Sequence, residues 1–71
     1  MGQFSDALKA IRKNAGKKQR EAAEYLGINL RTYQYYEEGR SEPNISTLIK
    51  LANFFQVSLD ELVGREWPAD R

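Results

Sequence analysis

The chain has no cysteine and no histidine among its 71 residues. Without cysteine it can form neither a disulfide nor a thiolate metal site. Without histidine it lacks the most common metal ligand and the most common general base. These absences argue against a disulfide scaffold, a zinc site and histidine-based catalysis, and we expect no metal and no cofactor.

Long hydrophobic runs are also absent. No stretch approaches the roughly 20 apolar residues of a membrane-spanning helix, and the first residues lack the apolar core of a signal peptide. Met1-Gly2 opens like a myristoylation motif, but Asp6 stands where that motif has serine or threonine. We therefore expect a cytoplasmic protein with no membrane attachment.

Catalytic patterns are missing as well. The adjacent acidic pairs Glu37-Glu38 and Asp60-Glu61 are consecutive in helical stretches, so their carboxylates point apart. The chain has no glycine-rich phosphate loop and no metal-ligand spacing. We predict that the protein is not an enzyme, and no small-molecule ligand is evident.

The net charge is only +1, but the charges are unevenly distributed. Residues 1–20 hold six lysines and arginines against one aspartate, whereas residues 37–71 hold four basic and seven acidic residues. A one-sided basic surface is typical of proteins that bind phosphate groups, although a solvated charged face gives the same pattern. The asymmetry by itself favours nucleic-acid binding only modestly.

Apolar residues recur at helical spacing along the chain, which predicts five short helices and no strand. The first apolar face consists of Phe4, Leu8, Ile11 and Ala15. The strongest one, on the fourth helix, consists of Ile45, Leu48, Ile49, Leu51, Ala52 and Phe55. The fifth helix would close the core with Leu59, Leu62 and Val63. The expected fold class is all-α.

Four polar residues predict where the later helices begin. Asn29 and Asn44 can accept the N-cap hydrogen bonds of the third and fourth helices. Ser58, with Glu61 three residues further on, forms a capping box for the fifth. We expect one domain over residues 1–64, followed by a short tail over residues 65–71.

The most informative stretch, Gln19 to Glu38, predicts a helix, a glycine turn and a second helix. Ala23 supplies the small residue that two closely crossing helices need, and Gly27 permits the turn. The second helix would be held in the core by Ile28, Tyr33 and Tyr36. Its outward face is then free for binding and carries Leu30, Arg31, Gln34 and Tyr35.

This pattern resembles the helix-turn-helix family of the phage Cro protein and phage repressors, the XRE family. The resemblance covers about residues 4–64. It is carried by Gln19, Ala23, Leu26-Gly27-Ile28, Thr32-Tyr33, Tyr36-Glu37-Glu38-Gly39 and the stretches 42–52 and 54–62. It implies a compact five-helix, repressor-like domain that binds double-stranded DNA sequence-specifically as a transcriptional regulator. Repression is the default expectation, because a bare reading domain can block polymerase without further parts.

The resemblance also implies which residues read bases. The third helix, about residues 29–38, would lie in the major groove. Leu30, Arg31 and Tyr35 match the family's base-reading positions, and Gln34 lies nearer the flank of the same face. Arg31 is the strongest candidate, because a guanidinium can bind O6 and N7 of guanine together. Leu30 would pack on a thymine methyl group.

Other matched positions imply contacts to phosphates or a structural role. Gln19 matches the family glutamine whose amide and backbone N–H meet a phosphate. Lys18, Thr32 and Arg40 are further phosphate candidates. Arg12 and Glu37 match a family pair that joins the first helix to the end of the third, so we expect these two residues to be structural.

Two lysines depart from the family pattern. Lys17 stands where the family usually has an apolar residue, and Lys18 stands where it has a serine or threonine cap. We expect Lys17 to lay its alkyl stem on the core and lift its charge into water. Because a lysine cannot accept the N-cap hydrogen bond, we expect the second helix to start less firmly.

Two questions stay open on the sequence. Helix-turn-helix domains also serve as adaptors or antitoxins, so a protein-interaction module with weak or no DNA binding is the alternative function. A single domain reads few base pairs, so we expect a homodimer, at least on DNA, on an inverted-repeat operator. The tail holds Trp67, which would either contact a second copy or fold over its own core.

Overall fold

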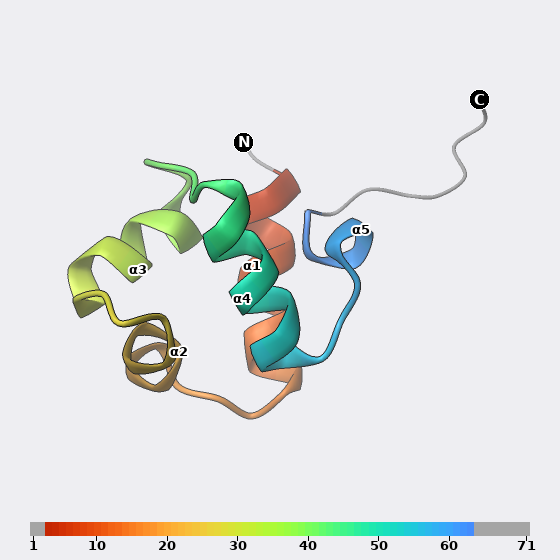
Figure 1. Cartoon of the computed structure of the whole chain (residues 1–71), viewed down its shortest axis with the longest axis horizontal. Helices are drawn as coiled ribbons and strands as arrows, with labels where there is room; N and C mark the ends of the chain where they lie inside the picture. Colours follow the sequence, from red (N-terminus) through yellow and green to blue (C-terminus); the bar gives the residue numbers. More distant parts are fainter. Residues whose placement is uncertain (1–2, 64–71) are drawn as a thin grey trace.

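The computed structural model describes residues 3–63, which form five helices and no strand (Figure 1). The helices are α1 (Gln3–Asn14), α2 (Gln19–Leu26), α3 (Leu30–Glu38), α4 (Ile45–Phe55) and α5 (Leu59–Leu62). The all-α, five-helix prediction is confirmed. Residues 65–71, the predicted tail with Trp67, lie outside the described residues. None of the helices within residues 3–63 is long and apolar enough to cross a membrane.

The helices begin where the sequence predicted. The side chains of Asn29, Asn44 and Ser58 each accept a hydrogen bond from the backbone N–H three residues further on, at 2.9, 2.9 and 3.0 Å. Glu61 Oε1 accepts a bond from the Ser58 N–H at 2.9 Å, which completes the capping box of α5. These side chains satisfy N–H groups that the first turn of a helix leaves without partners.

The turn between α2 and α3 depends on Gly27. Its φ is +74°, a left-handed conformation that side chains disfavour. There the Gly27 and Ile28 N–H groups bond back to the carbonyls of Glu24 and Ala23, at 3.1 Å each. The turn therefore closes α2 and sends the chain directly into α3.

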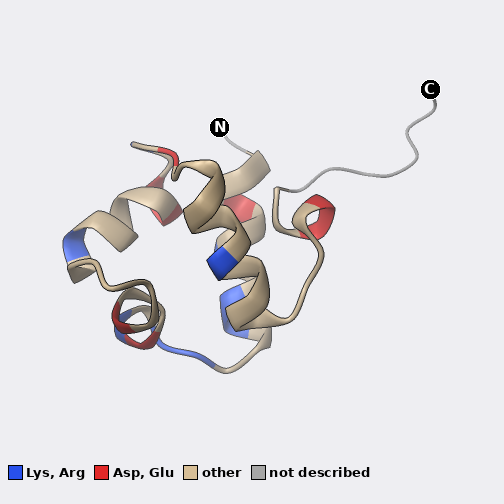
Figure 2. Ribbon diagram, viewed as in Figure 1, with Lys and Arg blue, Asp and Glu red and all other residues tan. Residues whose placement is uncertain are grey.

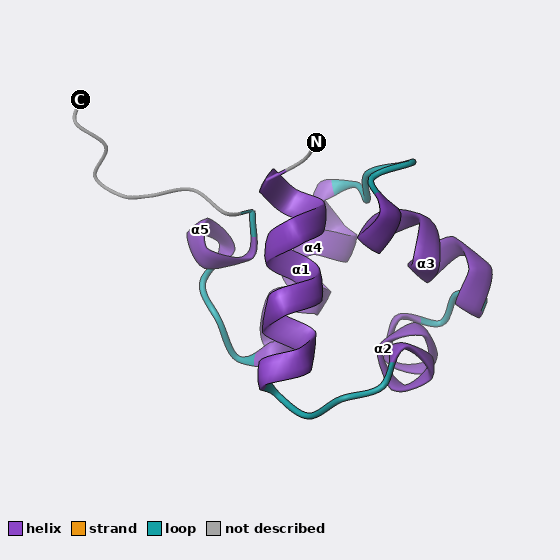
Figure 3. Ribbon diagram, turned by 180° about the vertical axis from the view of Figure 1, so that it is seen from behind, coloured by secondary structure: helices purple, strands orange, loops and turns teal. Residues whose placement is uncertain are grey.

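The core is formed by one face of each helix around α1. Figure 3 shows α1 between α5 on one side and α2 and α3 on the other. The buried apolar residues are Leu8, Ala22, Ala23, Leu26, Tyr33, Tyr36, Leu51, Ala52, Phe55 and Leu62. The burial of both tyrosines is confirmed, and their rings meet edge to face with centroids 6.3 Å apart. Two alanines of α2 lie against this bulk, so small residues face large ones.

The expected apolar face of α4 is only partly buried. Leu51, Ala52 and Phe55 are in the core, but Ile45 is 64% exposed and Ile49 is 46% exposed. Residues four apart share one side of a helix, and the neighbouring helices leave this strip open. Leu59, which was expected in the core, is 39% exposed. The sequence prediction was wrong at these three positions because apolar spacing gives the width of a face but not how much of it is covered.

Candidate nucleic-acid interface

Helix α3 is anchored on one side and open on the other. Tyr33, Tyr36 and Glu37 are buried against α1 and α2, whereas Arg31 is exposed and Leu30, Gln34 and Tyr35 are partly exposed. The four predicted base-reading residues are thus brought together on one helix. They have side-chain atoms available to a ligand, while the helix itself is anchored in the core by its buried side.

The charged residues that are separated along the chain are partly mixed in the fold. Figure 2 shows basic segments in the loop before α2, at the start of α3 and on α4, and acidic segments on α2, at the end of α3 and on α5. Lys17 and Lys18 make up the basic loop, and Arg31 is the basic residue of α3. These three residues offer positive charge to an anionic partner at the α2–α3 end, although acidic residues of both helices lie nearby.

Tyr35 lies beneath two arginines. The Arg31 Cζ is 5.4 Å from the centroid of the Tyr35 ring, and the Arg40 Cζ is 5.8 Å from it. Both distances are within the range of a cation–π interaction. Arg40 also forms a 2.9 Å ion pair between its Nε and Glu38 Oε1, and both of these side chains are exposed. Arg40 is thus directed toward α3, while Arg31 has no acidic partner among the described residues.

Glu37 is only 3% exposed and lies at the centre of a hydrogen-bond network. Its Oε2 accepts bonds from Arg12 Nε and from the Tyr33 hydroxyl, each at 2.6 Å. Its Oε1 accepts bonds from Arg12 Nη2 at 3.2 Å and from Gln19 Nε2 at 3.0 Å. One carboxylate therefore joins α1, α2 and α3. The structure contains the Arg12–Glu37 ion pair that the resemblance implied, and it adds Tyr33 and Gln19 as further donors.

The network shifts the pKa values of its members. Burial alone would raise the pKa of Glu37, but the hydrogen bonds from Arg12, Tyr33 and Gln19 outweigh it and hold that pKa below its ordinary value. Burial raises the pKa of the Tyr33 hydroxyl, and the Glu37 carboxylate raises it further. The hydrogen bond to Glu37 raises the pKa of Arg12. At neutral pH the carboxylate is therefore charged and every group that faces it is a donor.

Gln19 lies between this network and α3. Its Nε2 donates to Glu37, and its Oε1 accepts a bond from Gln34 Nε2 at 3.2 Å. Sequence reasoning placed Gln19 at a phosphate and did not foresee that its side chain links two residues of α3. The i, i+4 spacing of Tyr33 and Glu37 could have indicated their bond, but no sequence signal indicates the Gln19–Gln34 bond.

The remaining phosphate candidates differ in whether their polar groups already form hydrogen bonds within the protein. The Lys18 side chain makes no cap bond, as expected, but Glu21 Oε1 accepts from the Lys18 N–H at 2.7 Å and supplies half of a capping box. Thr32 donates its hydroxyl to Asn29 Oδ1 at 3.0 Å, so this hydroxyl belongs to the N-cap of α3. Lys17 is exposed, with its Nζ 5.6 Å from the centroid of the Phe54 ring.

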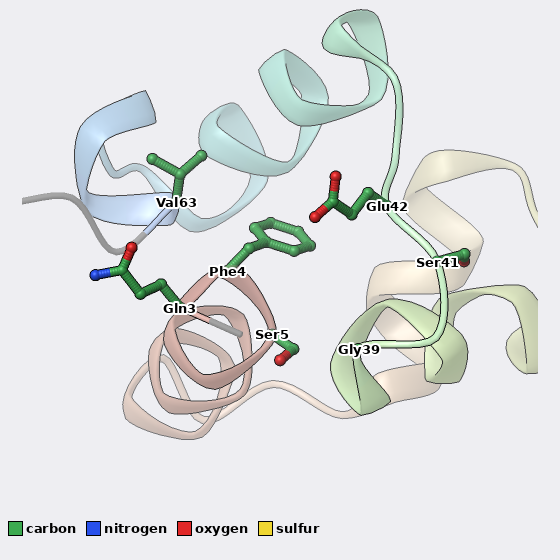
Figure 4. A pocket seen from close by; sticks show the side chains of 7 residues that line it. All are labelled: Gln3, Phe4, Ser5, Gly39, Ser41, Glu42 and Val63. Atoms are coloured by element: carbon green, nitrogen blue, oxygen red, sulfur yellow. The ribbon is translucent and has the colours of Figure 1, made fainter. Parts of the chain in front are cut away.

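A separate open pocket of about 490 Å³ lies between the start of α1 and the loop after α3. Figure 4 shows Phe4 in its middle, with Glu42 and Val63 at opposite sides. Glu42 is the charged residue of its lining. Because its carboxylate repels negative charge, this pocket does not suit the phosphates of a nucleic acid. Within residues 3–63 no group of three acidic residues could hold a metal ion.

Comparison with known proteins identifies the fold. A family model described as helix-turn-helix matches residues 8–62. The chain belongs to the helix-turn-helix family of the Cro and phage-repressor type. This is a family of DNA-binding transcriptional regulators rather than enzymes, which agrees with the expectation that the chain has no catalytic activity.

Relatives of this helix-turn-helix chain include named regulators. It is 41% identical over 59 residues to the cryptic phage CTXphi transcriptional repressor RstR of Vibrio cholerae serotype O1, covering 83% of this chain and 52% of that protein. It is 42% identical over 59 residues to the HTH-type transcriptional regulator ImmR of Bacillus subtilis, covering 83% of this chain and 46% of that protein. The chain thus spans about half the length of these curated relatives.

A solved structure has the same fold. The crystal structure of a transcriptional regulator from Listeria innocua superimposes with a TM-score of 0.82 at 39% sequence identity, covering 93% of this chain and 62% of that one. The helix-turn-helix of α2 and α3 is therefore set in the same five-helix framework as in that regulator.

Proposed function

We propose that this chain binds double-stranded DNA sequence-specifically and represses transcription, with α3 in the major groove. One observation carries the proposal: α3 is fixed on its inner side by the Glu37 network, while its outer side presents Arg31 without an acidic partner among residues 3–63. An anchored helix that carries a guanidinium without a carboxylate partner suits the width of the major groove and its hydrogen-bonding edges. The named repressor among the relatives supports repression.

Within this proposal the base-reading residues have distinct tasks. Arg31 binds O6 and N7 of a guanine, and Leu30 packs on a thymine methyl group. Tyr35 lies within cation–π distance of Arg31, so it holds the guanidinium close to the helix as well as reaching a base edge or a phosphate itself. Gln34 completes the face on the side nearest α2.

Phosphate contacts would fix the orientation of the helix on the duplex. Lys18 and the backbone N–H of Gln19 lie at the start of α2, where the Gln19 side chain bonds to Gln34 of α3, and Arg40 follows the end of α3. Thr32 can contribute only as an acceptor, or by giving up its bond to Asn29.

A single domain of this kind covers too few base pairs for specificity in a genome. We therefore propose that two copies bind an inverted repeat whose half-sites are about one helical turn apart. Two identical domains related by a twofold axis would place their two α3 helices in two successive major grooves on one side of the duplex.

The test is selection of a randomised duplex pool on the purified protein, followed by anisotropy titrations from low to high salt. We expect an enriched inverted repeat and an affinity that falls steeply with salt. Arg31→Ala should relax one position of each half-site and weaken binding to the selected sequence by roughly 5- to 150-fold. Lys50→Ala, which removes an exposed positive charge from α4, is the control and should leave the selected sequence unchanged.

The result also decides against the alternative function. If no sequence is enriched and duplex binding stays weak at low salt, the DNA-binding proposal is wrong. The chain would then be a protein-interaction module, and the exposed strip of Ile45 and Ile49 on α4 would be the first surface to examine.

A further inference from the structure

Gln34 is connected by hydrogen bonds to the buried carboxylate of Glu37, with Gln19 between them. Gln34 Nε2 donates to Gln19 Oε1 at 3.2 Å, and Gln19 Nε2 donates to Glu37 Oε1 at 3.0 Å. Glu37 is only 3% exposed, whereas Gln19 and Gln34 are both partly exposed. The three residues form a line from the core, along the inner edge of α3, to its ligand-facing side.

The direction of every bond in this line is fixed by Glu37. An ionised carboxylate has no proton to donate, so Gln19 must turn its NH₂ group toward it. The carbonyl oxygen of Gln19 then points the other way and can only accept, so Gln34 must turn its own NH₂ group inward. The reverse orientation of either amide would place two acceptors against each other, which leaves a partly buried polar contact unsatisfied.

Arg12 and Tyr33 keep the line from reversing. Arg12 donates to both oxygens of Glu37 and Tyr33 donates to Oε2, so the two residues hold the carboxylate charged and in place. A free glutamine on a helix surface can rotate its amide and present either end to a ligand. The bond to Gln19 favours one orientation of the Gln34 amide, in which Nε2 faces Gln19 and Oε1 stays available to a ligand.

An outward amide edge in this orientation has one matching base. No hydrogen bond within residues 3–63 occupies Gln34 Oε1 or the second hydrogen of its Nε2. These two groups form an acceptor beside a donor. In the major groove adenine presents the complementary pair, its N6 amine and its N7, whereas guanine presents two acceptors, cytosine a donor and thymine an acceptor.

We propose that the Glu37–Gln19–Gln34 line of hydrogen bonds makes Gln34 a reader of adenine and Gln19 the residue that positions it. The proposal rests on the DNA binding proposed above. Gln34 lies one helical turn after Leu30 on the same side of α3, so both side chains approach the duplex together. Arg31 and Gln34 would then specify different bases within one half-site, the first a guanine and the second an adenine.

The first experiment is the duplex selection, repeated with Gln34→Met and Gln19→Met. Methionine keeps the length of glutamine and removes its hydrogen bonds. We expect the wild-type half-site to contain an adenine whose preference disappears in Gln34→Met while the guanine read by Arg31 remains. Gln19→Met should weaken the same adenine preference, although methionine at this position makes no base contact. Gln3→Met, the same substitution at an exposed residue of α1, is the matched control for the pool and the assay.

Base analogues in the selected duplex then test the two bonds separately. Replacing that adenine by 7-deazaadenine removes N7, and replacing it by purine removes the N6 amine. Each should weaken wild-type binding, and together the two bonds should account for roughly 5- to 150-fold. Gln34→Met should bind the adenine, 7-deazaadenine and purine duplexes with equal affinity. Thermal melting of each variant confirms that it is folded under the binding conditions.

Four results would overturn the proposal, each at a different point. If the wild type binds no duplex, the proposed function fails with it. If the wild type selects a motif that Gln34→Met leaves unchanged, only the role of Gln34 is wrong. If the preference lost in Gln34→Met is for a base other than adenine, the orientation of the amide is wrong. If Gln19→Met lowers affinity evenly for all sequences, Gln19 is a phosphate contact and does not position Gln34.

Discussion

At the scale of single residues, Glu37 shows how one buried charge can connect several helices. Its carboxylate accepts four hydrogen bonds, from Arg12, Gln19 and Tyr33, and so connects three helices. Burying a charge is costly unless it is paired and hydrogen-bonded on every side, a condition that this site meets. Removing the charge would leave the mostly buried guanidinium of Arg12 without its counter-ion. We expect this unpaired charge to cost more free energy than the loss of the Glu37 hydrogen bonds.

We predict that Glu37→Gln destabilises the fold by about 3–5 kcal/mol, the usual cost of leaving one member of a buried ion pair unpaired. A domain of this size has only about 5–15 kcal/mol of stability in total, so the variant should be close to unfolding. Glu38→Gln is the matched control, because Glu38 pairs with Arg40 on the surface and its loss should cost about 1 kcal/mol or less. Urea denaturation followed by circular dichroism measures both. Equal losses in the two variants would contradict the prediction.

The lowered pKa of Glu37 predicts how stability depends on pH. A carboxyl whose pKa is lowered by folding stabilises the native state above its ordinary pKa, and this contribution is lost as pH falls toward the folded-state value. We therefore expect the free energy of unfolding to decline as the pH is lowered below the ordinary glutamate pKa of 4.5. The decline should be shallower in Glu37→Gln, measured by urea titrations between neutral and acidic pH. An identical pH profile in the variant would assign the acid sensitivity to other carboxylates.

At the scale of elements, the helices are defined by their ends as much as by their apolar faces. α3, α4 and α5 have complete side-chain caps. α2 starts at Lys18, which has the extended backbone of an N-cap, with φ −92° and ψ 154°, but lacks a side chain that can accept. The proposed phosphate contacts lie at the start of α2, which lacks the side-chain N-cap bond that α3, α4 and α5 have.

We predict that Lys18→Ser stabilises the fold by about 0.5–2 kcal/mol, because the serine hydroxyl would accept a hydrogen bond from one N–H group in the first turn of α2. The same change should weaken DNA binding and reduce the slope of log affinity against log salt by about 1, because one phosphate contact is lost. Lys17→Ser is the control and should give no stabilisation, since Lys17 precedes the cap position. Melting curves and salt titrations of the two variants would separate the two effects, and a more stable Lys18→Ser with unchanged DNA affinity would remove Lys18 from the interface.

Helix α4 offers a second comparison between two residues of one element. Leu51 is fully buried and Ile49 is 46% exposed. We expect Leu51→Ala to cost about 2–5 kcal/mol, from lost burial and a cavity, and Ile49→Ala to cost about 1 kcal/mol or less. Chemical denaturation of both variants measures the difference. If Ile49→Ala proves as costly as Leu51→Ala, the isoleucine strip is covered in solution.

At the scale of the whole molecule, charge and symmetry determine what the domain can do. Basic residues lie in the loop before α2 and at the start of α3, while α5 is acidic (Figure 2). The small net charge therefore does not exclude a local positive surface of Lys17, Lys18 and Arg31 that favours contact with a polyanion. Affinity for one half-site remains limited, because a single α3 meets only a few base pairs.

We predict that two chains bind each duplex carrying the full inverted repeat. A duplex with one half-site should bind more weakly by roughly 100-fold or more, since it loses the effective concentration that a second linked site provides. Sedimentation of the protein with each duplex gives the stoichiometry, and anisotropy gives the affinities. One chain per full-site duplex with equal affinity for the half-site would show that the domain acts as a monomer.

The sequence by itself determined the helices, their caps and the helix-turn-helix. These features rest on local chemistry: apolar spacing, an asparagine or serine before a helix, and a glycine that adopts a positive φ. It also determined which side chains face outward on α3, because that face follows from the same helical period. The positions it misjudged, Ile45, Ile49 and Leu59, are apolar residues at the edge of a face, where burial depends on the reach of a neighbouring helix.

Only the tertiary structure decided which polar side chains meet. Gln19 and Gln34 are 15 residues apart and belong to different helices, and their hydrogen bond depends on the angle at which α2 crosses α3. The same is true of Arg12 and Glu37, which are 25 residues apart, except that the family resemblance supplied that pair in advance. Hydrogen bonds need alignment to within a few tenths of an ångström. No periodicity in the sequence specifies such distances, because they are set jointly by every side chain that packs between the helices.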